Sequence, residues 1–233
     1  MKFCLYLEYQ YPVRFQPIDS TATPHTLFDY EHRFIRKKDP REILIFTDGT
    51  CSGNGQKHPQ AGCAIVHRPS IYSQTGQLTH GGTVRFRLET EGPTGIRYQQ
   101  TSNRAKLRAV IAALHFRDWS MDCNRSWRSL VIATDSEYAA INVTERVQNW
   151  ETNGWKLSGG GDVKNQDLWK LLPKLIRKLL QGGVKVSFWR IPREWNSSAD
   201  EFAKSAVDMK ETLKFEVLES SRPIQIKIRP FVP

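Results

Sequence analysis

Short apolar runs along the chain predict strands, and longer stretches with apolar residues three and four positions apart predict helices. Continuous apolar runs at 43–47 and 130–134 are typical of strands buried on both faces. Further strands are predicted at 61–66 and 184–189. Residues 83–88 alternate apolar and charged side chains, which is the pattern of a half-exposed strand.

Helical spacing of apolar residues predicts helices from a Ser102 cap to about residue 115, from a Ser136 cap to about 147, over 168–180, and from Asn196 or Ser197 to 207. The element order is therefore β-β-β-α-β-α-α-β-α. Three strands in hairpin order, followed by alternating elements, predict an α/β protein. Its five-stranded mixed sheet would be flanked by α-helices.

Three segments divide the chain. Residues 1–40 mix aromatics, prolines and charges without a sustained period, and we expect an N-terminal extension packed on the domain or trailing from it. The domain itself is predicted at 41–210. Residues 211–233 form a C-terminal tail in which 224–228 alternate and could add an edge strand.

The charge of the chain favours a polyanionic partner. Its 233 residues carry a formal net charge of +10, and 39% of them are hydrophobic. Such a composition supports a core and favours nucleic acid or an acidic membrane surface as partner, although it also fits a protein that is merely soluble and basic. No apolar run approaches the roughly 20 residues that span a bilayer, and the first residues make a poor signal peptide.

The cysteines give no metal-binding pattern. Cys4, Cys51, Cys63 and Cys123 lack the spacing of a zinc site. Cys51 and Cys63 could form a disulfide between neighbouring strands, but free buried thiols in a reducing compartment are favoured. We therefore expect an intracellular protein, with cytoplasm, nucleus and mitochondrion unresolved.

Three acidic residues follow predicted strand ends or open a helix. Asp48 ends the first strand, Asp135 ends the fourth, and Asp200 lies at the start of the last helix. Each alone is more typical of a turn or a helix cap. Together they could converge, because neighbouring strand ends lie about 5 Å apart, and a divalent cation would relieve their repulsion.

With these acids in place, the sequence resembles the eukaryotic, fungal-like type of ribonuclease H over about residues 41–208. The matching stretches are 47–49, 101–105 with Leu107, 133–136, 153–156, 163–169 and 196–200. The resemblance implies the ribonuclease H-like fold with strand order 3-2-1-4-5, and cleavage of the RNA strand of RNA/DNA hybrids. It also implies two magnesium ions, with Asp48 bridging both, Asp135 binding one and Asp200 the other.

Lys106 departs from the pattern that this resemblance implies, because the family has its fourth carboxylate, a glutamate, at this position. An ammonium there would compete with a metal, and we expect Lys106 to form a salt bridge with Asp48 and Asp135 that suppresses two-metal catalysis. Alternatively, Lys106 points outward on its long stem, or another acid substitutes: Glu89, Glu91 or Glu137. The loop 191–196 also lacks the histidine that many relatives carry.

The nucleic-acid surface implied by the resemblance is better preserved. Its residues are Trp150, Trp155 and Ser158 along the DNA strand, Thr101 and Asn165 at a DNA phosphate, and Ser102 and Asn103 at the RNA 2′-hydroxyl. A core role for the tryptophans is the alternative. Basic side chains surround the segment at 146, 156, 164, 170, 174, 177 and 178. Those at 174, 177 and 178 are expected on a solvated helix face.

Three functions stay open on this evidence. The favoured one is a monomeric nucleic-acid-binding protein with an RNA/DNA hybrid as ligand and an impaired active site. The second is a working magnesium-dependent hybrid endonuclease. The third is a non-catalytic scaffold that binds a protein partner through its termini.

Overall fold

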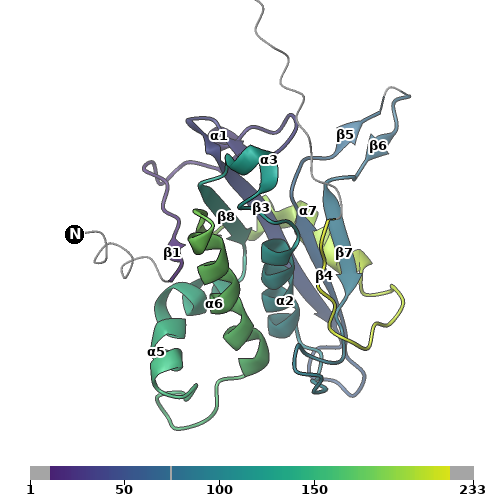
Figure 1. The fold of residues 1–233 in the computed structure, drawn as a ribbon. Coiled ribbons are helices and arrows are strands. Elements are labelled where there is room, and N and C mark those ends of the chain that lie inside the picture. The colour runs from purple at the N-terminus through teal and green to yellow at the C-terminus, as the bar shows by residue number, and fades with distance from the viewer. Residues whose placement is uncertain (1–10, 74, 221–233) are drawn as a thin grey trace, which may run out of the picture.

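A mixed β-sheet forms the centre of the molecule in the computed structural model, which describes residues 11–73 and 75–220 (Figure 1). Its long strand β3 (Asp39–Ser52) lies parallel to β8 (Ser129–Thr134) and antiparallel to β4 (Gln60–Val66). Outside these lie β7 (Thr83–Arg87) and β9 (Lys185–Arg190). The five run in the order β7-β4-β3-β8-β9, so the predicted order is confirmed.

Successive residues of the central strands point to opposite faces of the sheet and build two cores. On β3, Ile43 and Ile45 join one apolar cluster, whereas Leu44 and Phe46 join another. All four are buried. Apolar side chains on both faces need cover from two layers, which explains why this strand is continuously apolar.

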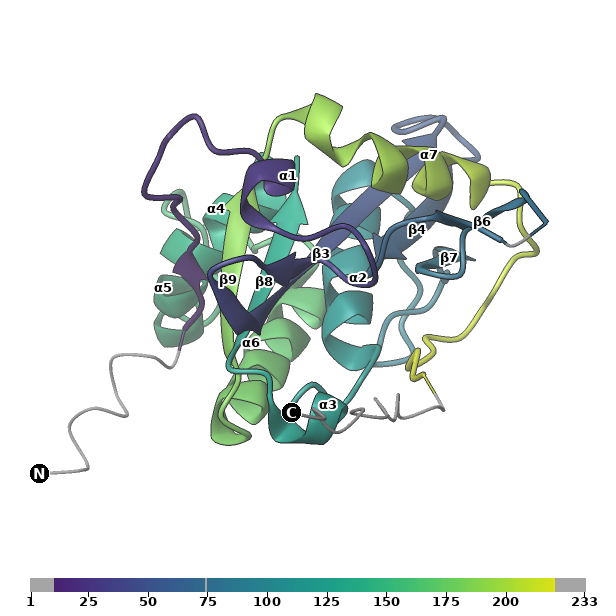
Figure 2. The same ribbon diagram turned by 90° about the horizontal axis from the view of Figure 1, so that it is seen from above.

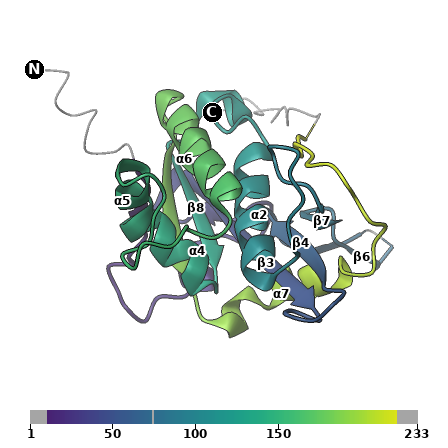
Figure 3. The ribbon, with the colours of Figure 1, turned by 90° about the horizontal axis from the view of Figure 1, so that it is seen from below.

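Helices cover the face of the sheet to which Ile43 and Ile45 point (Figure 3). They are α2 (Ser102–His115), α4 (Glu137–Ile141), a π-helical turn (Asn142–Arg146), α5 (Val147–Thr152) and α6 (Gln166–Gln181). The opposite face carries α7 (Ser197–Ser205), and the view from above separates it from α2 and α6 (Figure 2). The predicted helices are therefore present, with Pro173 inside α6 as expected.

The described part of the N-terminal segment packs onto the sheet. Its short strands β1 (Val13–Arg14) and β2 (Ile35–Arg36) pair with β9 and β3, and between them lies α1 (Pro24–Leu27). Phe28 and Phe34 are 0% and 3% exposed and complete the core beneath α7. Within the described residues, the sheet thus contains seven strands, five of them predicted.

Two further segments lie outside the predicted elements. The ribbon of β5 (Ile71–Tyr72) and β6 (Leu78–Thr79) projects from the body (Figure 1). At the other end of the chain, the described tail residues pack near α2, where Arg108 lies between the rings of Phe86 and Phe215. The edge strand expected at 224–228 falls outside the described residues.

Two local expectations have a clear outcome. Thr101, and not Ser102, caps α2, because its hydroxyl accepts the hydrogen bond of the Arg104 backbone N–H. Cys51 and Cys63 are free thiols, as favoured. No helix in residues 11–73 or 75–220 is long and apolar enough to cross a membrane.

Candidate active site

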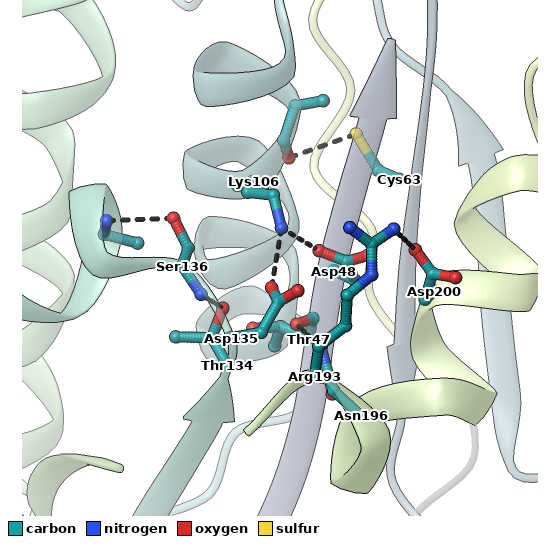
Figure 4. A network of polar contacts seen from close by, with 12 residues as sticks. Thr47, Asp48, Cys63, Lys106, Thr134, Asp135, Ser136, Arg193, Asn196 and Asp200 are labelled. Carbon is teal, nitrogen blue, oxygen red and sulfur yellow. Dashed lines mark hydrogen bonds and ion pairs between the residues drawn. The ribbon is translucent and has the colours of Figure 1, made fainter. Parts of the chain in front are cut away.

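Asp48 and Asp135, two of the three predicted acids, meet at one ammonium group, and Asp200, on α7, is held by other cations (Figure 4). Asp48 lies within β3, two residues beyond the Phe46–Ala133 pair that joins β3 to β8, and Asp135 follows β8 directly. Asp200 lies in the first turn of α7, on the other side of Asp48. Parallel pairing of β3 with β8 therefore places Asp48 and Asp135 next to each other, where β8 ends.

Gly49 brings helix α2 against these acids. A Cβ added to Gly49 would lie 2.2 Å from the carbonyl carbon of Ala105 and 2.3 Å from the backbone nitrogen of Lys106. Only a glycine allows this approach of helix to strand. The residue after Asp48 thus fixes the distance at which the side chain of Lys106 meets the carboxylates.

Lys106 bridges two of the acids. Its Nζ donates hydrogen bonds to Asp48 Oδ1 at 2.7 Å and to Asp135 Oδ1 at 2.6 Å. The Lys106 side chain is only 18% exposed, and those of Asp48 and Asp135 are 2% and 9% exposed. Figure 4 shows the ammonium between the two carboxylates. The expected salt bridge is present, and Lys106 does not point outward.

The pKa shifts follow from this burial and pairing. Burial raises the pKa of Asp48 to about 6; Lys106 acts to lower it, and the charge of Asp135 adds to the rise. Burial opposes the charge of Lys106, but the attraction of Asp48 and Asp135 outweighs it and raises the pKa of the ammonium. Lys106 is therefore charged at neutral pH.

Asp200 is paired with cations of its own. Arg193 Nη2 lies 2.9 Å from Asp200 Oδ1, and Lys204 Nζ lies 2.5 Å from Oδ2. Burial acts to raise the pKa of Asp200, but the two cations outweigh burial and lower it. The Arg193 and Lys204 side chains are 69% and 58% exposed, so water screens these ion pairs and weakens them. Lys204, four residues after Asp200 on one helix, could have been predicted from its spacing.

The donor set does not fit a pair of divalent ions. The two divalent ions that the sequence resemblance implies would need carboxylate oxygens that are free to bind them. Here an ammonium stands between Asp48 and Asp135. Within the described parts of the chain, no three histidine, cysteine, aspartate or glutamate side chains are grouped to hold a metal. Glu89 does not replace the missing carboxylate, because it pairs with Arg108.

A pocket of about 560 Å³ opens at the N-terminus of α2, one helical turn before Lys106. Its lining includes four of the predicted nucleic-acid residues: Thr101, Ser102, Asn103 and Asn165. The helix dipole favours an anion at such an end. Lys164, one of the basic side chains expected around this surface, also lines the pocket, whereas sequence reasoning did not assign the remaining residues to it: Asn54, Gly55, Tyr98, Gln99 and Tyr138.

A buried ion pair holds the two sides of this pocket together. The Arg104 guanidinium binds Asp167 through both ends, with distances of 2.9 and 2.7 Å. It also donates to Asn165 Oδ1 at 3.4 Å and stacks 4.0 Å from the Tyr98 ring centroid. Asn165 has a φ of 59°, so its backbone is left-handed. Arg104 thus ties α2 to the start of α6, a contact that no local pattern predicts.

Trp150 and Trp155, both predicted along the DNA strand, differ in how far they are buried. Trp150 is only 7% exposed and packs edge-on against Trp169 in the core, so it does not offer a free face to nucleic acid. This packing agrees with the core role that the sequence left open as the alternative, and contact of Trp150 with a DNA strand stays a prediction. Trp155 is half-buried, with a φ of 66°, and Lys170 Nζ lies 5.7 Å from its ring centroid. Ser158 is exposed on the neighbouring loop.

This sheet order, with one acid inside β3, another directly after the neighbouring β8 and a helix across them, defines a ribonuclease H-like α/β domain. The family model for RNase H matches residues 40–208. The chain belongs to the ribonuclease H family. It is 32% identical to ribonuclease HI of Haemophilus influenzae over 169 residues, covering 72% of this chain and 92% of that protein.

More distant similarities agree. Identity to human ribonuclease H1 is 28% over 173 residues, or 72% of this chain and 51% of the human protein. The fold also matches a foamy viral protease-reverse transcriptase solved in complex with an RNA/DNA hybrid, with a TM-score of 0.50 and 21% identity. That match covers 71% of this chain and 20% of the viral one.

Proposed function

We propose that this protein binds RNA/DNA hybrids on a ribonuclease H surface and that Lys106 suppresses metal-dependent cleavage. The observation that carries the proposal is the position of Lys106 Nζ, 2.7 Å from Asp48 and 2.6 Å from Asp135. The ammonium neutralises the charge that would attract a divalent ion and occupies oxygen atoms that would bind it.

Hybrid binding is supported by the parts of the site that Lys106 does not touch. Thr101, Ser102, Asn103 and Asn165 line one open pocket at a helix N-terminus. The net charge of +10 favours a polyanion. A viral relative in fold has been solved with an RNA/DNA hybrid. For this chain, the same class of ligand fits the pocket and the charge.

The proposal has a direct test. A gel shift with a labelled hybrid at low salt measures binding, and a fluorogenic hybrid measures cleavage in magnesium. We expect the wild-type protein to bind the hybrid and leave it intact, and Lys106→Glu to cleave it. Equal cleavage by both proteins would instead support a working endonuclease, and no binding by the wild-type protein would support the scaffold function.

A further inference from the structure

Lys106 is a cation that the protein itself supplies at the centre of its acidic site, and this has a consequence for binding. In a two-metal site, divalent ions screen the carboxylates from the negative backbone of the nucleic acid. Without a cation there, Asp48 and Asp135 would repel each phosphate that approaches. The ammonium at 2.7 and 2.6 Å provides that screening permanently.

We infer that hybrid binding by this protein is independent of divalent metal, because the Lys106 ammonium takes the electrostatic place of the ions and faces the nucleic-acid backbone. This inference rests on the proposed function and specifies how that site meets its ligand.

Lys106 can donate a hydrogen bond to a bound phosphate while it holds Asp48 and Asp135. An ammonium has three N–H donors, and the two carboxylates receive two of them. The side chain is 18% exposed, which leaves one side open at the surface. A phosphate oxygen there would receive a charge-assisted hydrogen bond, which is stronger than a neutral one.

The surrounding cations reinforce this arrangement. Arg193 and Lys204 pair with Asp200, the third acid, and both side chains are more than half exposed. Each of the three acids therefore has a cation from the chain itself: Lys106 for Asp48 and Asp135, Arg193 and Lys204 for Asp200. Three negative and three positive side chains leave the cluster with no net charge. A neutral cluster does not repel a polyanion.

The test compares hybrid affinity in EDTA and in magnesium chloride at constant ionic strength, using fluorescence anisotropy of a labelled RNA/DNA duplex. We expect the wild-type dissociation constants in the two buffers to agree within about twofold. Lys106→Met should bind about tenfold or more weakly in EDTA, since it loses a charged hydrogen bond, and magnesium should restore part of its affinity. Lys174→Met, on an exposed part of α6, is the control for loss of a positive charge.

The outcomes separate the two proposals. Wild-type binding that is more than tenfold tighter in magnesium than in EDTA would overturn the inference and leave the proposed function standing. No wild-type binding in either buffer would refute both. Circular dichroism of Lys106→Met checks its fold, and the comparison of buffers on the wild-type protein needs no variant at all.

Discussion

Lys106→Glu should convert the protein into one that magnesium stabilises. In the wild-type protein, Asp48, Asp135 and Lys106 have a summed charge of −1, and the substitution changes it to −3. A divalent ion carries two charges, so a change of two unit charges at the site is equivalent to four interactions between unit charges. Even at about 4 Å in bulk water, each is worth about 1 kcal/mol, so the ion gains about 4 kcal/mol, or roughly a thousandfold in affinity.

Calorimetry makes this gain visible. In EDTA, Lys106→Glu should unfold at a lower temperature than the wild-type protein, because three carboxylates then share a mostly buried site. Magnesium at about 100 times its dissociation constant adds about 2.7 kcal/mol, which for a chain of this size raises the unfolding temperature by about 5–10 °C. The wild-type unfolding temperature should not change with magnesium.

The matched control is Lys174→Glu, which makes the same charge change at an exposed position of α6. Its unfolding temperature should be indifferent to magnesium. The reasoning is refuted if magnesium stabilises the wild-type protein as much as Lys106→Glu, since the ammonium would then be no barrier to the ion.

Three further predictions concern the fold and the pH dependence. Gly49→Ala should lower the free energy of unfolding by about 1–3 kcal/mol or more in urea titrations, because its Cβ would overlap the backbone of α2, whereas Gly159→Ala meets no atom within 4 Å and should have a far smaller effect. The pKa of Asp48 is raised from 3.8 to about 6, so the folded state binds more protons than the unfolded state between these values, and stability should fall as pH rises through that window. Asp48→Asn should remove that part of the decline; an unchanged pH profile of the unfolding temperature would show that Asp48 does not titrate there. Trp150→Ala should cost about 3–5 kcal/mol of stability as a core truncation, whereas Trp155→Ala should mainly weaken hybrid binding in a gel shift; the opposite result would place Trp150 on the binding surface.

The central sheet could be predicted because each of its strands carries a local pattern. Continuous apolar residues in β3 and β8 indicate burial on both faces, and the structure places their alternate side chains in two cores. The Lys106 salt bridge could also be predicted, because the resemblance to ribonuclease H places residue 106 beside the acids at 48 and 135. Local pattern and final fold agree at these positions.

Contacts between distant segments were not predictable in this way. Arg104 and Asp167 pair across 63 positions of sequence, and neither position shows a local sign of this. Phe28 and Phe34 enter the core from a segment with no periodicity. Trp150 was expected near nucleic acid because of the resemblance, whereas its packing depends on α6, which follows it in the chain. Such positions are decided by tertiary packing.

Phe28 and Phe34 of the N-terminal segment limit where a shortened fragment of the protein can begin. The match to the family model begins at residue 40, yet Phe28 and Phe34 lie under the sheet and β2 pairs with the start of β3. A fragment that starts at residue 40 would leave Leu44 and Phe46 facing water, and such surfaces cause aggregation. A well-behaved fragment for crystallisation therefore has to begin upstream of Phe28, before the point where the match to the family model starts.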